Sequence, residues 1–128
     1  MTASNVNSSP QLQQCPASPN CVSSQSADSH YIEPFKIAAN CNAAFEAVRQ
    51  ILANRPDTVI KSATDEMIAV EFKTTLGFVD DGLFMLDSDN RLIHVRSAAR
   101  LGYWDLGKNR RRLEEIRAMY NQSDDALP

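Results

Sequence analysis

The sequence predicts a single α+β domain, in which an antiparallel sheet of about five strands carries two helices on one face. Segments with alternating apolar residues come in two adjacent pairs, each joined by a short polar turn as in a β-hairpin. One segment with apolar residues at helical spacing precedes these pairs and another follows them, giving the order β-α-ββ-ββ-α. We expect the domain to span residues 30–122, after a polar arm at 1–29 and before a short tail at 123–128.

Most of the N-terminal arm is expected to be disordered. Residues 1–14 are almost all polar or small, so little burial offsets the entropy that is lost on ordering them. The stretch from Cys15 to Cys21 differs, because two prolines and an asparagine favour a stiff turn. We expect this turn to be ordered, with its two cysteines either bridged in a structural disulfide or reduced.

The first strand and the first helix lie between the arm and the hairpins. A strand is expected at 31–37 on the edge of the sheet, since Pro34 removes one donor from the ladder. The next segment predicts an amphipathic helix that Asn40 or Asn42 caps and that ends before Pro56. Its apolar stripe comprises Ala44, Phe45, Val48, Ile51 and Leu52.

Two β-hairpins form the centre of the predicted sheet. They are expected at 58–63 with 67–74 and at 79–86 with 92–97. The face that should pack against the helices carries Ile68, Val70, Phe72, Phe84, Leu86, Ile93 and Val95. The other face carries Leu83, Met85, Leu92, His94 and Arg96. This second face is apolar enough that we expect the N-terminal arm, or a second copy in a homodimer, to cover part of it.

The last helix is expected at 106–120, with Asp105 as its N-cap. Its apolar stripe comprises Leu106, Leu113, Ile116 and Tyr120. Asn109 falls on the same stripe, where an unpaired amide costs about 1–3 kcal/mol, so it must have partners. We expect these partners in the backbone of residues 97–103 or among the side chains of Asp80, Arg96 and Arg100.

Three separated motifs follow one another along the chain. They read CPASPNCVSS (15–24), GFVDDGLF (77–84) and VRSAARLGYWDLGKNRRRLEEIR (95–117). In these motifs and in their order the sequence resembles the DUF1499 family, and the resemblance covers nearly all of the chain after Gln14. It implies an uncharacterised protein, because the family brings no established activity, cofactor or catalytic residue to carry over.

Charge and hydropathy limit the class of partner. A net charge of −3 over 128 residues argues against nucleic acid, because proteins that bind it usually carry a basic excess. No apolar run approaches the roughly 18 residues of a membrane span, and the first residues lack the pattern of a signal peptide. We therefore expect a cytoplasmic protein as the chain stands, with a periplasmic or membrane-associated location as the alternative if an export segment is missing.

Acidic and basic side chains gather in and after the second hairpin. Asp80 and Asp81 with nearby arginines could form a site for an anion or a polar ligand, with guanidinium groups as fork-shaped donors. If the hairpin turns at residues 88–89, Asp81 lies directly opposite Arg96. The alternative is a structural ion-pair network that fixes the loop at 97–104. The ligand-binding candidates are Asp80, Asp81, Arg96, Arg100, Tyr103, Asp105, Asn109 and Arg110.

The sequence contains no pattern typical of a metal site or a cofactor. The two histidines are far apart, and the spacing of Cys15 and Cys21 fits neither zinc nor a redox Cys-x-x-Cys motif. Residues 87–91 begin like a calcium loop, but the segment lacks the glycine and the final glutamate of that loop. Residues 102–107 lack the glycine spacing of a phosphate-binding loop. We expect no metal and no cofactor.

Three functions are compatible with these patterns. The leading hypothesis is a small non-enzymatic binding or accessory domain, with a polar Asp/Arg/Tyr/Asn cluster between the sheet and the last helix and an unknown small molecule or protein as its partner. The alternatives are a hydrolase that uses the same cluster and a structural interaction module. An enzyme needs titratable groups that converge on a pocket, whereas an interaction module shows an exposed apolar patch.

Overall fold

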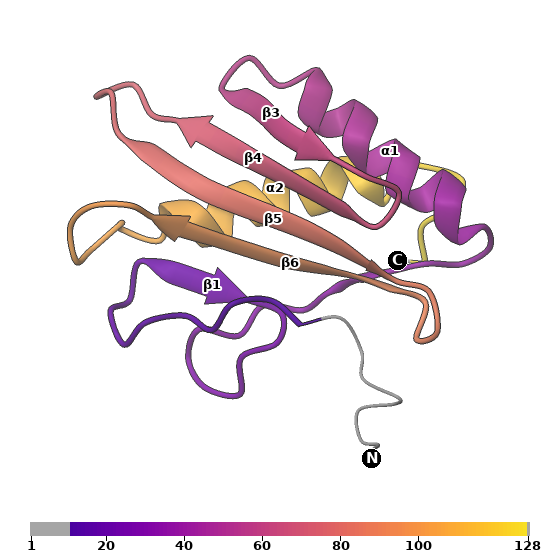
Figure 1. Cartoon of the computed structure of the whole chain (residues 1–128), viewed down its shortest axis with the longest axis horizontal. Coiled ribbons are helices and arrows are strands. Elements are labelled where there is room, and N and C mark those ends of the chain that lie inside the picture. Colours follow the sequence, from indigo (N-terminus) through magenta and orange to yellow (C-terminus); the bar gives the residue numbers. More distant parts are fainter. Residues whose placement is uncertain (1–10, 128) are drawn as a thin grey trace.

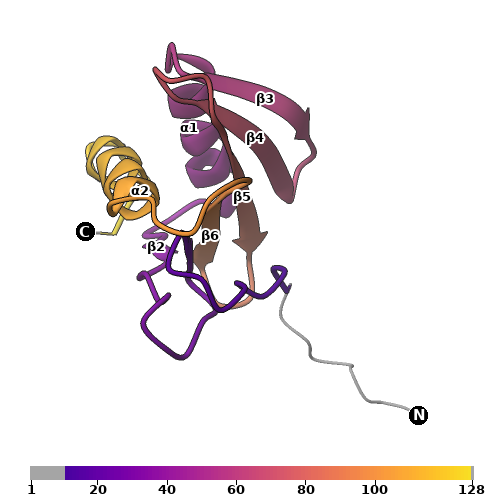
Figure 2. The ribbon, with the colours of Figure 1, turned by 90° about the vertical axis from the view of Figure 1, so that its left-hand side faces the viewer.

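The computed structural model describes residues 11–127 of the chain. Its centre is an antiparallel sheet in the order β1-β6-β5-β4-β3 (Figure 1), and the short β2 also pairs with β6. The strands are β1 (Cys21–Ser23), β2 (Phe35–Lys36), β3 (Thr58–Ala63), β4 (Met67–Lys73), β5 (Val79–Asp87) and β6 (Leu92–Ala99). The helices α1 (Cys41–Ala53) and α2 (Lys108–Tyr120) lie on one side of this sheet (Figure 2).

The α+β class and the two helices on one face are confirmed. Within residues 11–127 the sheet has six strands where about five were predicted, because the N-terminal arm supplies β1 at its edge. β1 runs antiparallel to the end of β6, and the two residues of β2 pair with the beginning of β6. The strand predicted at 31–37 is reduced to β2, with isolated bridges at Tyr31 and Ile37.

The hydrophobic core lies between the sheet and the two helices. The sheet contributes Ile68, Val70, Phe72, Phe84, Leu86, Ile93 and Val95, which are all buried. The helices contribute Phe45, Val48, Leu52, Leu113 and Ile116, which are buried as well. The predicted alternation of the strands and the predicted helical stripes are therefore correct for these residues. Phe35 of β2 joins this core by stacking on Tyr120, with ring centroids 5.2 Å apart.

The two helices begin in different ways. Asn40 caps α1, because its side chain accepts a hydrogen bond from Ala43 N at 2.8 Å. α2 begins at Lys108 rather than at residue 106, because Leu106 and Gly107 both have left-handed backbone, with φ of 57° and 77°. The prediction that Leu106 belongs to the buried stripe is wrong, since its side chain points outward and the residue is 84% exposed. Within residues 11–127, no helix is both long and apolar enough to cross a membrane.

The turn between β5 and β6 decides which residues face each other. The last pair before the turn joins Asp87 to Leu92, so the turn has four residues instead of two. The prediction that Asp81 lies opposite Arg96 assumed the shorter turn and is wrong. Arg96 faces Leu83, two positions along β5, so every side chain keeps its predicted face while its partner changes.

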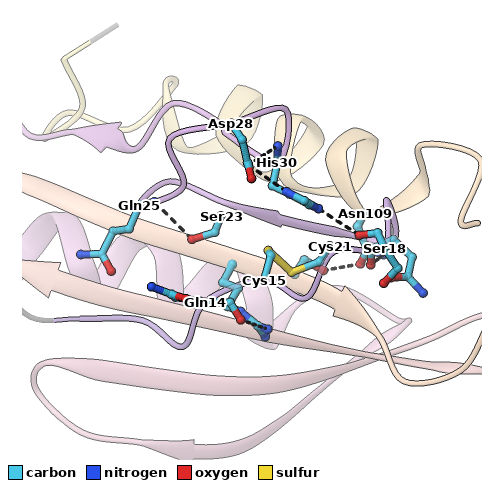
Figure 3. Close-up of a disulfide and its surroundings, with 12 residues drawn as sticks. Gln14, Cys15, Ser18, Cys21, Ser23, Gln25, Asp28, His30 and Asn109 are labelled. Atoms are coloured by element: carbon cyan, nitrogen blue, oxygen red, sulfur yellow. Dashed lines mark hydrogen bonds and ion pairs between the residues drawn. A yellow bond between two sulfur atoms is a disulfide. The ribbon is translucent and has the colours of Figure 1, made fainter. Parts of the chain in front are cut away.

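The N-terminal arm covers part of the second face of the sheet. Leu12 is buried, and Gln14 O accepts a hydrogen bond from Arg96 Nη2 at 3.3 Å. A disulfide joins Cys15 to Cys21, with Cα atoms 5.7 Å apart, and ties the arm to β1 (Figure 3). The arm is thus one cover of this face, and the homodimer stays a prediction. Of the residues predicted to be disordered, 1–10 lie outside the described part of the chain.

Candidate functional site

Two loops meet at the end of the sheet where β5 begins and β6 ends. They are the turn between β4 and β5 (74–78) and the connection between β6 and α2 (100–107), which lie at the same end of the molecule (Figure 1). Arg100 N donates a hydrogen bond to Val79 O at 3.3 Å between them. A cavity of about 470 Å³ opens between these loops and the first residue of α2. We call residues 74–79 and 99–108 the loop end.

A buried ionic cluster lies beneath the loop end, on the helix face of the sheet. Asp80 is 1% exposed, and its Oδ2 lies 3.0 Å from Nη1 of Arg112 and 3.4 Å from Nζ of Lys108. The Arg112 guanidinium also lies over the ring of Phe72, 4.5 Å from the ring centroid. Neither oxygen of Asp80 has a well-directed hydrogen bond from the described residues, so its contact with Arg112 is mainly electrostatic. A charge buried in this way depends on its partner.

Asn109 joins α2 to this cluster and to the N-terminal arm. Its Oδ1 accepts hydrogen bonds from Ser97 Oγ and, at 3.2 Å, from Arg112 Nη1. Its Nδ2 donates to Asp105 Oδ2 at 2.8 Å and to Asn20 O at 3.4 Å. The amide is fully buried, and both of its donors and both of its acceptor positions are used. Asn109 therefore acts as a clasp between the helix, the sheet and the arm.

Asp105 orders the loop before α2. Its Oδ1 accepts from Gly107 N at 2.8 Å and its Oδ2 from Asn109 N at 3.2 Å. Burial acts to raise the pKa of Asp105, but the hydrogen bonds from Asn109 and Gly107 outweigh it and lower that pKa below its ordinary value. The N-cap position itself belongs to Gly107, because the left-handed residues intervene. Asp105 thus accepts hydrogen bonds from backbone donors at the start of α2, although it lies two residues before the N-cap residue Gly107.

The sheet separates the two adjacent carboxylates of β5. Asp81 points to the face opposite Asp80, where its two oxygens accept hydrogen bonds from Arg100 at 2.8 and 2.9 Å. Glu71 accepts from the same guanidinium at 2.7 Å. The side-chain hydrogen bonds of Asp81 and Glu71 raise the pKa of Arg100 above its ordinary value. This surface network is separate from the buried cluster, so the two aspartates do not act together.

The other predicted site residues lie apart from both groups. Arg96 lies on the second face of the sheet, where burial lowers its pKa. Arg110 donates to two backbone carbonyl groups of the segment before β2. Tyr103 is exposed and packs edge to face against Trp104, with ring centroids 5.3 Å apart. The eight candidates therefore fall into several groups: Asp80, Asp105 and Asn109 belong to the buried cluster, Asp81 and Arg100 pair on the opposite face, and the other three lie apart.

Large apolar side chains are exposed around the cavity. Trp104 is 71% exposed and Phe78 is half exposed, and both line the cavity. The exposed apolar residues of the loop end also include Leu76, Leu101, Tyr103 and Leu106. The left-handed backbone of Leu106 is one that a leucine rarely adopts, and it accompanies a side chain outside the core. Exposed apolar patches of this kind commonly mark binding surfaces.

A second polar group lies near the other end of β6, on the second face of the sheet. The Nδ1 of His94 lies 3.1 Å from Ser24 Oγ, and its Nε2 lies 3.3 Å from Asp87 Oδ2. The order Ser-His-Asp is that of a catalytic triad, but all three residues are buried. Ser24 Oγ also accepts from Val95 N at 2.9 Å. The group therefore fixes the turn after β1 onto β6, and sequence reasoning missed it because only the fold brings the three residues together.

A histidine holds the arm close to the disulfide. Figure 3 shows His30 between Asp28 and Ser18: its Nδ1 lies 2.8 Å from Asp28 Oδ1 and its Nε2 lies 2.9 Å from Ser18 O. The hydrogen bonds with Asp28 and Ser18 raise the pKa of His30 above its ordinary value. Asn109 lies beside the same disulfide in this view, so the arm meets α2 next to the buried cluster.

Comparison with known families agrees with the three sequence motifs. The family described as "Protein of unknown function (DUF1499)" matches residues 11–119. The chain belongs to the DUF1499 family. No curated protein and no solved structure matches the chain.

In this DUF1499 chain the three motifs converge at the loop end and the cluster beneath it. The first forms the disulfide turn, the second enters β5, and the third runs from β6 through the loop into α2. Sequence reasoning missed Arg112 and Lys108 as members of the cluster. Arg112 lies three residues after Asn109, and this helical spacing is a signal that could have found it. Among residues 11–127, no group of three or more His, Cys, Asp or Glu side chains is placed to hold a metal ion.

Proposed function

We propose that this domain is a non-enzymatic binding module whose ligand is an amphiphile, with an apolar body and an acidic group, held in the cavity at the loop end. The lining of the cavity carries the proposal. Phe78, Leu101 and Trp104 supply apolar walls, and Lys108 supplies a cation at the start of α2. Small-molecule sites are commonly apolar clefts with a few well-placed polar groups.

Lys108 favours an acidic group on the ligand. Its side chain is 32% exposed, so the amine can reach a bound molecule although it lies 3.4 Å from Asp80 Oδ2. Asp80 is also paired with Arg112, so two cations share one carboxylate. Asp57 reaches only the other side of Arg112, at 3.9 Å from Nε. An anionic group beside Lys108 gains from this shortage of negative charge.

The same contacts disfavour the hydrolase alternative. Asp80 is buried against Arg112, and Asp105 is occupied by backbone and amide donors at the helix start. Asp81 and Arg100 bind each other on the opposite face. These titratable groups are engaged with one another rather than poised to move a proton on a substrate. Apart from these engaged groups, of which Asp80, Arg100 and Asp105 also line the cavity, a ligand there meets apolar side chains and the amine of Lys108.

The disulfide supports an oxidising compartment. Bridges such as Cys15–Cys21 persist in periplasmic and secreted proteins and are rare in the reducing cytosol. We therefore favour the periplasmic or membrane-associated location over the cytoplasmic one that was expected from the sequence. Thiol labelling of the denatured protein, taken directly from cells, tests this. Cys41 is a free thiol and should label at once, whereas the other two should label only after reduction.

Trp104 makes the ligand proposal directly testable, because it is the only tryptophan of the chain and lines the cavity. Anilinonaphthalene sulfonate combines an aromatic body with an acidic group. We expect it to accept energy from Trp104 in a saturable manner, and we expect decanoate to displace it. Binding that is not saturable, or that decanoate does not reverse, contradicts the proposal.

A pair of lysine variants tests the role assigned to the cation. Lys108→Met should weaken the binding of anilinonaphthalene sulfonate about tenfold or more, because a hydrogen bond to a charged group is worth about 1.5–3 kcal/mol. Lys36→Met is the matched control, since Lys36 pairs with the first residue of β6 at the other end of the sheet. Its affinity should equal that of the unchanged protein. Equal affinities for all three proteins would remove Lys108 from the site.

A further inference from the structure

The loop end and the residues that flank it combine exposed apolar side chains with positive charge. The segments 73–79 and 99–112 hold six basic residues and one acidic residue, a net charge of +5 in a chain whose total is −3. Glu71, Asp80 and Asp81 in the flanking strands reduce this local charge to +2 and leave −5 on the rest of the chain. One end of an acidic protein therefore carries a net positive charge.

We infer that the loop end docks on the surface of a membrane that contains anionic lipids, with its apolar side chains inserted at the level of the head groups. The inference rests on the proposed function, since it names a lipid as the source of the amphiphile. Proteins that lie on a membrane bury apolar area at the boundary of head groups and acyl chains. Basic residues near that boundary add attraction to anionic lipids.

The apolar side chains project outward from two separate loops. Leu76 and Leu106 are each more than four-fifths exposed, and Trp104 is exposed as part of the cavity wall. Tryptophan and tyrosine favour the head-group level of a bilayer, because each has an apolar ring and a polar tip. The left-handed backbone of Leu106 is a strained conformation that gains no burial in the core. Insertion into a membrane explains why the side chain of Leu106 is exposed.

The arrangement fits a bilayer better than a protein partner. Protein interfaces have a closely packed apolar centre within a polar rim. Here Phe78, Leu101 and Trp104 line a hollow, and basic residues flank the two loops, with Lys73 at the end of β4 and Arg111 in the first turn of α2. Acyl chains, head groups and phosphates lie at successive depths in a bilayer and match this succession.

Vesicle binding by the full chain tests the inference, with Trp104 emission and flotation as readouts. We expect vesicles of phosphatidylcholine with added phosphatidylglycerol to shift the emission to shorter wavelength and to carry the protein. Vesicles of phosphatidylcholine alone should bind about tenfold more weakly or worse, because they lack the negative surface. Added salt should weaken the binding to the anionic vesicles.

Paired variants separate the loop end from the rest of the surface. The double variant Leu76→Ser, Leu106→Ser should bind anionic vesicles about tenfold more weakly or worse, since two exposed apolar side chains are lost. The control Met119→Ser, Leu127→Ser removes two exposed apolar side chains at the other end of the molecule and should bind like the unchanged protein. Thermal unfolding should be the same for all three, which excludes misfolding as the cause.

Each outcome decides between the two proposals. If the soluble amphiphiles bind in the cavity and neither kind of vesicle binds, the membrane inference is overturned, the proposed function stands, and the loop end is left as a surface for a protein partner. Vesicle binding that the leucine variant does not weaken also overturns the inference. If anionic vesicles bind through the two leucines while the soluble amphiphiles fail to bind, membrane docking stands and the cavity proposal fails.

Discussion

The middle of the sheet and the loop end place polar and apolar side chains in opposite ways. In the middle, residues such as Phe84 and Val95 are fully buried beneath the helices. At the loop end Trp104 faces solvent, and the buried side chains directly beneath it include Asp80 and Asn109. Burying a charge and exposing an apolar ring both cost free energy. The loop end is therefore not arranged for stability alone, as is expected of a binding surface.

Truncation in the middle of the sheet should have the largest effect on stability. Phe84 is fully buried, with its ring centroid 6.4 Å from that of Phe35. Phe84→Ala should lower the free energy of unfolding by ~3–5 kcal/mol, through lost burial and the cavity left behind. Urea denaturation measures this loss. The folded fraction should still bind anilinonaphthalene sulfonate normally, and a large loss of affinity would break the separation of the two regions.

Removing the positive partner of Asp80 should cost nearly as much. Arg112→Met keeps an apolar contact with Phe72 but leaves a buried carboxylate with Lys108 as its remaining cation, so we expect a loss of about 3 kcal/mol. The double variant Asp80→Asn, Arg112→Met removes both charges and should recover much of this stability. Chemical denaturation of the two proteins makes the comparison. A double variant less stable than Arg112→Met would show that the cluster is not an ionic pair.

Loss of the Asn109 clasp should have an intermediate effect. Asn109→Ala leaves several buried groups unpaired, so the free energy of unfolding should fall by about 1–3 kcal/mol.

The pKa of Asp105 is lowered in the folded state, so its stabilisation is present above an unfolded pKa of about 4 and is lost as the pH falls through the folded value. In Asn109→Ala the free energy of unfolding should therefore depend less steeply on pH in this acidic range. An unchanged pH dependence in acid denaturation would count against the link between the two residues.

The smallest effect on stability is expected for Leu106, whose apolar side chain is exposed to solvent. Leu106→Asn should change the free energy of unfolding by no more than about 0.5 kcal/mol, because asparagine tolerates left-handed backbone and no core contact is lost. Differential scanning calorimetry checks this, with vesicle flotation on the same protein. The substitution should therefore weaken membrane binding without lowering stability. A strong loss of stability would place Leu106 in the core after all.

Periodicity was sufficient to predict the middle of the sheet, because burial alone decides the pattern there. Alternation placed Phe84 on the inner face, and helical spacing placed Asn109 beneath α2. At the loop end the left-handed backbone of Leu106 and Gly107 has no counterpart in apolar spacing, so the predicted helix began two residues early. The error in register had another source, since the polar turn after Asp87 is compatible with more than one length.

The candidate site was predictable in its position but not in its pairing. Strand alternation implies that Asp80 and Asp81 point to opposite faces. Their partners are Arg112 and Arg100, and several other arginines lie as close in sequence. The choice depends on how α2 crosses the sheet and on the reach of a long side chain, which residue spacing does not contain. Lys108 joins the cluster for the same reason.

The ring closed by Cys15 and Cys21 contacts the loop between β6 and α2, which is distant in sequence. Asn20 lies within this ring, and its Nδ2 donates to Gly102 O at 2.7 Å while its backbone oxygen accepts from Ala99 N and from Asn109. Through these hydrogen bonds the ring holds the first half of the loop that carries Trp104. We expect a reductant that opens the disulfide to loosen this loop while the core beneath the helices keeps its packing, and amide hydrogen exchange of residues 100–107 before and after reduction measures this.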